Sequence, residues 1–112
     1  MRNISCALTR PQIDDGTKTE TRRLGWRFVE AGMCLQFVNK CMGFKRGEKP
    51  VKIRQVKVIE TRREPLNAID QEAVIREGFP DLSPAQFVEM FCKNMRCKPT
   101  DEVTVIRFRY LD

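Results

Sequence analysis

The sequence predicts a small α+β domain in which a curved, mostly antiparallel sheet or small barrel is flanked by helices. Three observations lead to this prediction. Several segments alternate apolar and polar residues as half-buried strands do, and two segments before the last strand carry helix caps and helical spacing. The length of 112 residues, with 41% hydrophobic residues, suits one folded unit. We therefore expect a single domain over residues 1–112, built around one hydrophobic core.

The first elements are a strand and a short helix. Apolar and polar residues alternate over residues 4–9, which predicts the first strand. Thr9 and Gln12 have the spacing of a capping box, and Pro11 suits a first helical turn. We expect this helix to end at Gly16, because glycine readily adopts the left-handed conformation that closes helices.

Two strands and an exposed connection should follow. A turn at residues 30–32 leads into a strand that buries Met33, Leu35 and Phe37, and the segment 42–50 is rich in glycine and charge. The next strand begins at residue 51 and should end at Pro65. Its apolar residues change face near Arg54 and Gln55, so we expect a β-bulge there.

The last third of the chain predicts two helices and a strand. Asp70 caps a helix that runs to Glu77 and is closed by Gly78. A capping box at Ser83, with proline in the first turn, opens a longer amphipathic helix. The final strand spans residues 103–110. Glu-Thr-Arg-Arg occurs at 20–23 and again at 60–63, which we interpret as coincidence because the flanking residues differ.

Composition narrows the possible partners. The chain has 21 Lys plus Arg against 15 Asp plus Glu, a formal charge of +6 that favours polyanions such as nucleic acid. Five cysteines form no C-x-x-C pair and no histidine is present, so we expect buried, inert thiols, no metal and no cofactor. Without an apolar leader or a membrane-spanning stretch, the expected location is the cytoplasm.

The residues best suited to chemistry gather in a polar loop, Gly16 to Arg23. Because the chain lacks histidine, proton transfer must use other groups, and a lysine whose pKa is lowered by burial can activate a threonine. Lys18 and Thr21 are spaced for this. Glu77 is notable because a carboxylate at a helix C-terminus opposes the helix dipole. The alternative to a catalytic role is that the loop is simply a solvated polar surface and that Glu77 pairs with a surface cation. Trp26 can either pack in the core or stack on a base. Outward strand cations that suit phosphate are Lys52, Arg54, Arg107 and Arg109.

The segment Gly16-Thr17-Lys18-Thr19-Glu20-Thr21-Arg22-Arg23 resembles the G-x-K-T-x-T-x-R signature of ASCH domains, relatives of the PUA fold. The order of the other expected elements also resembles this family, including the Glu77-Gly78-Phe79 helix end. The resemblance implies a PUA-like β-barrel of five or six strands with two or three helices, and a cleft for RNA, a nucleotide or a modified nucleoside.

The resemblance also implies a possible reaction. Bacterial acetylcytidine amidohydrolases of this family use a lysine, a threonine and a glutamate, which correspond to Lys18, Thr21 and Glu77. In that mechanism Thr21 attacks the acetyl carbonyl, Lys18 acts as base and Glu77 orients the lysine, while Arg23 holds a phosphate or an oxyanion. Arg22 replaces an apolar residue of those enzymes, and other family members are ribonucleases.

Three functions remain open on the sequence: a nucleic-acid or nucleoside binder, a hydrolase, and a protein-interaction domain. We favour binding in a basic cleft, because catalysis also requires Lys18 to lose its proton. The residues expected around the ligand, besides the three with catalytic roles, are Gly16, Thr19, Arg22, Arg23, Trp26, Arg62 and Arg63.

Overall fold

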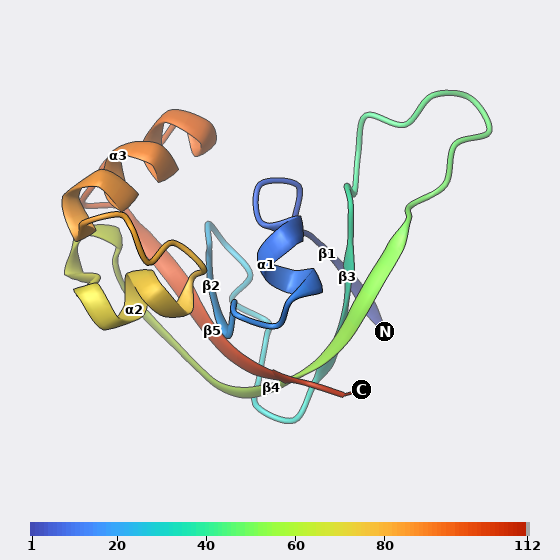
Figure 1. The fold of residues 1–112 in the computed structure, drawn as a ribbon, viewed down its shortest axis with the longest axis horizontal. Coiled ribbons are helices and arrows are strands. Elements are labelled where there is room, and N and C mark those ends of the chain that lie inside the picture. Colours follow the sequence, from blue (N-terminus) through green and yellow to red (C-terminus); the bar gives the residue numbers. More distant parts are fainter. Residues whose placement is uncertain (112) are drawn as a thin grey trace.

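The computed structural model describes residues 1–111, which form a five-stranded mixed sheet curled into a half-barrel with helices at its sides (Figure 1). The strands are β1 (Arg2–Ser5), β2 (Glu20–Arg23), β3 (Cys34–Val38), β4 (Lys52–Pro65) and β5 (Glu102–Tyr110). The helices are α1 (Arg10–Asp14), α2 (Gln71–Arg76) and α3 (Pro84–Met95), and Leu66–Ala68 form a 3-10 turn. The strand order is β1-β3-β4-β5-β2, and only the β1–β3 pair is parallel within this range. The predicted α+β class and small curved sheet are confirmed.

The first strand is shorter than the predicted range of 4–9. The backbone N–H of Thr9 donates to the carbonyl of Cys6 at 2.9 Å, so the chain turns away from the sheet after Ser5. Thr9 precedes α1, but its side chain makes no capping hydrogen bond. The predicted capping box is therefore wrong there, because the turn holds the Thr9 backbone outside the extended conformation that an N-cap residue needs.

The long strand β4 contains the predicted change of face. Its pairing with β3 skips Ile53, which lies beside the predicted position, and its pairing with β5 skips Ile59. Val56 and Val58, between the two irregularities, are buried. The strand ends at Pro65 as expected, because proline has no N–H to continue the ladder.

The two later helices begin where their capping residues predicted. Asp70 accepts a hydrogen bond from the backbone N–H of Ala73, and Ser83 and Gln86 form a complete capping box at the start of α3. Both capping signals depend on residues three apart in the sequence, so they favour the start of a helix independently of the rest of the fold. No helix in residues 1–111 has the length and apolar character needed to cross a membrane.

The apolar interior divides into two clusters rather than the single core we expected. One lies inside the half-barrel and includes Ile4, Ile13, Leu35, Phe37, Val56, Val58, Ile106 and Phe108. The other joins α2 and α3 to the ends of β4 and β5 and includes Leu66, Val74, Phe87, Phe91, Val103 and Val105. The strand β5 contributes to both, because both of its faces are covered.

The two Glu-Thr-Arg-Arg segments occupy equivalent positions on either side of β5. In β2 and in β4 alike, the Glu pairs with Arg107, the Thr with Ile106, the first Arg with Val105 and the second with Thr104. The repeated sequence thus corresponds to a repeated pairing with β5, whereas we had interpreted the repeat as coincidence. Because a strand alternates its faces, each segment presents Glu and its first Arg on one face and Thr and its second Arg on the other.

We predict that Gly78→Ala destabilises the fold more than Gly32→Ala. Both glycines have positive φ, +100° and +95°, so both substitutions strain the backbone. A methyl group on Gly78 would also lie 2.8 Å from Cγ of Gln12, whereas nothing lies within 4 Å of one on Gly32. The additional overlap should cost about 1–3 kcal/mol. Urea unfolding of the two variants measures this difference, and equal losses would contradict it.

Candidate functional site

The predicted polar loop divides into a connection and a strand. Residues 16–19 are irregular, but Glu20–Arg23 form β2, whose residues pair with β5. The predicted loop is wrong for this half, because the charged side chains of Glu20 and Arg22 find ion-pair partners on other elements. The backbone of Thr19 fixes the entry to the strand: its N–H donates to the carbonyl of Arg76 at 2.8 Å, and its carbonyl accepts from Phe108 at 3.1 Å.

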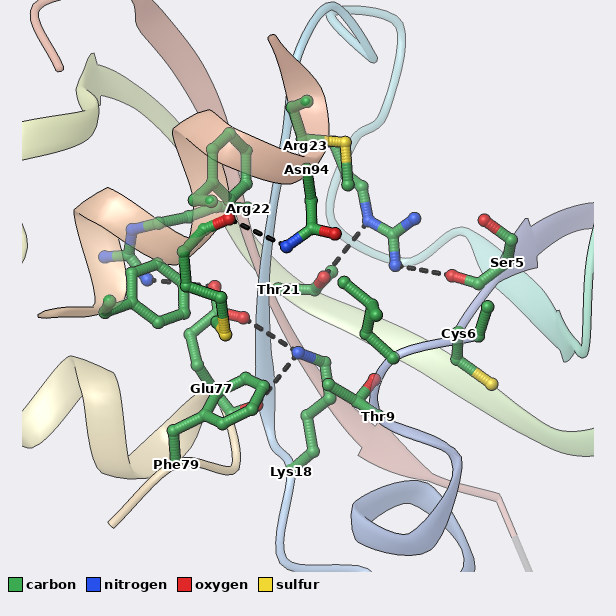
Figure 2. A pocket seen from close by; sticks show the side chains of 16 residues that line it. Ser5, Cys6, Thr9, Lys18, Thr21, Arg22, Arg23, Glu77, Phe79 and Asn94 are labelled. Atoms are coloured by element: carbon green, nitrogen blue, oxygen red, sulfur yellow. Dashed lines mark hydrogen bonds and ion pairs between the residues drawn. The ribbon is translucent and has the colours of Figure 1, made fainter. Parts of the chain in front are cut away.

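A cavity lies at the side of β2, between α3 and the segment that follows β1 (Figure 2). Its polar lining includes Ser5, Thr9, Lys18, Thr21, Arg22, Arg23, Glu77 and Asn94, and its apolar lining includes Cys6, Ala7, Leu8, Phe79, Phe87, Met90, Phe91 and Met95. The three residues predicted for catalysis therefore line one cavity. The helix α3 supplies much of the apolar wall, and β2 supplies polar groups opposite it.

Lys18 and Glu77 form a buried ion pair. The Lys18 Nζ donates to Oε1 of Glu77 at 2.7 Å and to its backbone carbonyl at 2.9 Å. Burial lowers the pKa of Lys18 below its ordinary value of 10.5, and the carboxylate of Glu77 opposes this shift. The backbone of Lys18 is also held, by the carbonyl of Gln12 and the hydroxyl of Tyr110. The amine is thus fixed in place and easier to deprotonate than an exposed lysine.

Thr21 and Arg23 form the second polar pair of the cavity. Arg23 Nε donates to Thr21 Oγ1 at 3.1 Å, and its Nη2 donates to the carbonyl of Ser5 at 2.7 Å. In the part of the chain that the structure describes, no carboxylate forms a salt bridge with Arg23 and no hydrogen bond joins Lys18 to Thr21. Arg23 therefore brings to the cavity a positive charge that no carboxylate contacts directly; burial lowers the pKa of its guanidinium, and the charge of Glu77 opposes this shift.

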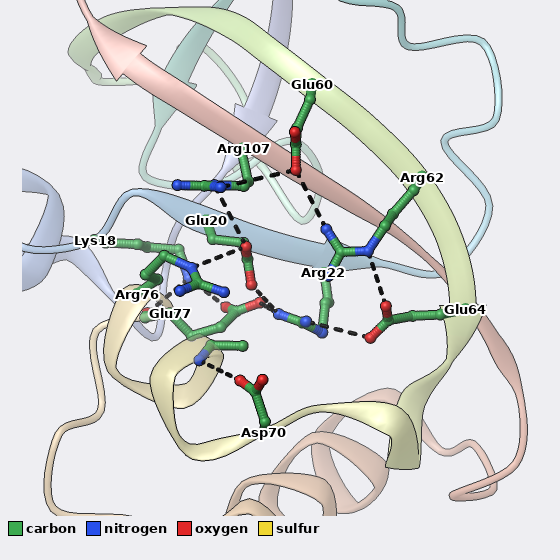
Figure 3. A network of polar contacts seen from close by, with 11 residues as sticks. Lys18, Glu20, Arg22, Glu60, Arg62, Glu64, Asp70, Arg76, Glu77 and Arg107 are labelled. Atoms are coloured by element: carbon green, nitrogen blue, oxygen red, sulfur yellow. Dashed lines mark hydrogen bonds and ion pairs between the residues drawn. The ribbon is translucent and has the colours of Figure 1, made fainter.

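Arg22 points its charge away from this pair, because adjacent residues of a strand face opposite sides. Its Nη1 lies 2.5 Å from Oε2 of Glu20 and 3.2 Å from Oε2 of Glu77, and its Nη2 lies 3.4 Å from Oε2 of Glu64 (Figure 3). Burial works against this charge, but the Glu77 and Glu20 carboxylates outweigh it and raise the pKa of the guanidinium. Although Arg22 borders the cavity, its terminal nitrogens are engaged within the protein.

The ion pairs continue outward from Glu20, which is completely buried. Its Oε1 lies 3.2 Å from Nε of Arg76 and 3.8 Å from Nε of Arg107, and Arg107 reaches Glu60 on β4 at 3.8 Å. Glu20 was not singled out by the sequence. Its spacing of two from Arg22 is the available signal, since residues two apart share a face of a strand.

The other residues predicted around the ligand do not line this cavity. Gly16 lies near Arg54 and Tyr110, and Thr19 makes backbone hydrogen bonds to Arg76 and Phe108. Trp26 packs beside Phe28, with the two ring centroids 5.3 Å apart. Arg62 pairs with Glu60 and Glu64, and Arg63 is exposed on β4. Sequence reasoning missed Asn94 and the aromatic residues of α3 as cavity lining, because their helical spacing equally suits core packing.

The cysteines differ from the expectation of buried thiols. Cys6 is buried, Cys41 is exposed, and the other three are partly buried. The Sγ atoms of Cys92 and Cys97 lie 3.6 Å apart, and burial raises the pKa of Cys97 to about 11. No group of three or more potential metal ligands lies together in residues 1–111.

Comparison with known proteins identifies the fold. No protein-family model and no curated protein matches the sequence. Solved structures that resemble it include an ASCH domain from Lactobacillus crispatus JV V101, with a TM-score of 0.68 and 14% identity over 97% of this chain and 79% of that one. Hypothetical protein PH0355 has a TM-score of 0.67 and 19% identity over 99% of this chain and 100% of that one. Protein EF3133 from Enterococcus faecalis V583 has a TM-score of 0.64 and 13% identity over 92% of this chain and 69% of that one. The chain therefore has the fold of ASCH domains, as its signature suggested.

We predict that Arg22→Met destabilises the protein by about 3–5 kcal/mol, because it takes a buried cation away from the carboxylates of Glu20 and Glu77. Arg62→Met is the matched control: it occupies the equivalent position across β5, and its exposed ion pairs are worth about 1 kcal/mol or less. Urea unfolding compares the two variants. Similar losses would show that Arg22 has no special place in the buried network.

Proposed function

We propose that this protein binds a nucleotide, a modified nucleoside or one residue of an RNA strand in the cavity beside β2. The observation that carries the proposal is the division of the cavity into an apolar wall and a polar group of side chains. Nucleosides have the same division, since a planar base has apolar faces and a hydrogen-bonding edge. The resemblance of Gly16 to Arg23 to the ASCH signature implies the same ligand class, and the fold is that of an ASCH domain.

The apolar wall offers contacts for the faces of a base. Phe79, Met90 and Met95 border the cavity beside the more deeply buried Phe87 and Phe91. Aromatic side chains stack on bases, and methionine adapts its shape to flat ligands. The exposed Asn94 donates to the carbonyl of Met90 through Nδ2, which leaves its amide oxygen available to a base amino group.

Arg23 is suited to the anionic part of such a ligand. Lys18 and Arg22 have carboxylate partners in Glu77 and Glu20, whereas Arg23 donates to uncharged oxygen atoms in Thr21 and Ser5. A phosphate could therefore approach Arg23 without separating an existing salt bridge. This arrangement favours one small anionic ligand over a long stretch of polyanion within the cavity itself.

We predict that Arg23→Gln weakens the binding of a ribonucleoside 5′-monophosphate about 10- to 100-fold, the effect of losing a hydrogen bond to a charged group. Binding of the matching nucleoside, which has no phosphate, should change less. Arg63→Gln is the control, because Arg63 pairs with the same β5 residue, Thr104, but lies outside the cavity. Calorimetric titration with the four ribonucleotides and with N4-acetylcytidine tests the proposal. Equal effects of the two substitutions, or no binding of any of these ligands, would contradict it.

Hydrolysis of an amide on a nucleoside is a second candidate, favoured by the environment of Lys18 and Thr21. Both residues line the cavity, and burial lowers the pKa of Lys18. Arg23 Nε donates a hydrogen bond to the hydroxyl oxygen of Thr21. For the reaction, Lys18 Nζ would turn from Glu77 and accept the proton of the Thr21 hydroxyl as Oγ1 attacks the acyl carbon. The same proton would pass to the departing amine, and water would then hydrolyse the acyl ester to release acetate and free Thr21.

In this reaction the neighbouring charges have distinct roles. Glu77 would hold the lysine in position before the attack and stabilise it once it becomes protonated. Arg23 would favour the negative charge that develops near Thr21.

We predict that Thr21→Val abolishes release of acetate from N4-acetylcytidine, whereas Thr61→Val preserves it. Thr61 is a matched control because it lies in the second Glu-Thr-Arg-Arg segment and also pairs with Ile106. The rate should rise with pH as Lys18 loses its proton, with a midpoint below 10.5 because the pKa of Lys18 is lowered. Enzymatic determination of acetate measures both effects. Absence of release by the wild-type protein, or equal rates in both variants, would exclude this reaction.

A further inference from the structure

The connection between β3 and β4 is a basic projection on the fold. It comprises residues 39–51 and extends away from the rest of the molecule (Figure 1). Four Lys or Arg and one Glu give it a net charge of +3, half of the formal charge of the whole chain. We call this segment the basic loop.

The acidic residue of the basic loop is used within the loop. Glu48 Oε1 lies 3.0 Å from Nζ of Lys40 and accepts a hydrogen bond from the backbone N–H of Lys45 at 2.9 Å. The side chains of Lys45, Arg46 and Lys49 are exposed and form no salt bridge in residues 1–111. Three cations are thus presented to solvent without compensation.

The neck of the basic loop is ordered and adjoins the cavity wall. Asn39 and Val51 close the neck through two hydrogen bonds, of 3.1 and 2.9 Å. Cys6, which lines the cavity, donates its backbone N–H to the carbonyl of Val38, the residue before the loop, at 3.0 Å.

We propose that the basic loop binds the phosphates of a single-stranded RNA that places one of its residues in the cavity. This inference rests on the function proposed above and extends it from one nucleotide to a strand. Within the cavity Arg23 can serve one phosphate, so further backbone phosphates need cations outside it. The basic loop supplies them on a projection whose neck adjoins the cavity wall at Cys6.

An RNA strand suits the loop better than a membrane surface does. The large apolar side chains that the loop exposes are Met42 and Val51, which lie far apart in its sequence and form no apolar face for insertion into lipid. Its aromatic residue, Phe44, is partly buried, with Nζ of Lys40 lying 5.5 Å from its ring centroid.

The test compares two triple variants of equal charge. One replaces Lys45, Arg46 and Lys49 by Gln, and the other replaces Lys93, Arg96 and Lys98, which are exposed elsewhere, by Gln. Fluorescence anisotropy with an unstructured oligoribonucleotide of about 12 nucleotides measures affinity across a series of salt concentrations. The loop variant should bind about tenfold or more weakly and lose about 2 units of the log–log salt slope, since each phosphate contact contributes about 0.7.

The inference is supported if the loop variant loses RNA affinity and salt dependence, the control variant does not, and both bind a mononucleotide as the wild type does. It is overturned if both variants lose RNA affinity equally, if the loop variant loses none, or if the wild type binds phosphatidylserine vesicles but not the oligonucleotide. Failure of the cavity proposal would be seen in a different measurement, the calorimetric titration: mononucleotide binding would be absent, or Arg23→Gln would not weaken it.

Discussion

The carboxylate of Glu77 contacts two buried cations at once, Lys18 before β2 and Arg22 within it. Through these contacts the end of α2 is fixed to β2, the edge strand of the sheet. The cavity keeps its shape only while α2 and β2 stay in this relative position. A buried carboxylate with two well-placed cations is tolerated because each charge is compensated, whereas removal of any partner exposes the desolvation cost of the others. The position of the candidate site therefore depends on electrostatics as much as on apolar packing.

The sequence was sufficient wherever structure depends on neighbouring residues. The caps at Asp70 and Ser83, the change of face in β4 and the stop at Pro65 are local signals, and all of them appear in the structure. The nature of Glu20–Arg23 was not predictable in this way. Three of its four residues are charged, and they become a strand because Arg76, Glu77 and Arg107 reach them from distant parts of the chain.

The same limit applies to the candidate site. Lys18, Thr21 and Glu77 line one cavity, as the signature implied, but Arg22 and Arg23 were expected to act together on a ligand. The strand places them on opposite faces, where Arg22 stabilises the network and Arg23 enters the cavity. The two arginines could have been distinguished from the sequence only by first recognising β2 as a strand.

The strand β5, which lies between β4 and β2, connects the two apolar clusters, with Val103 and Val105 in one and Ile106 and Phe108 in the other. Neither cluster can lose its order without disturbing a strand that the other also needs. The domain should consequently unfold as one cooperative unit despite its divided interior. A ligand bound beside β2, which pairs with β5 along its whole length, would then resist the opening of both clusters and protect amide hydrogens far from the cavity against exchange.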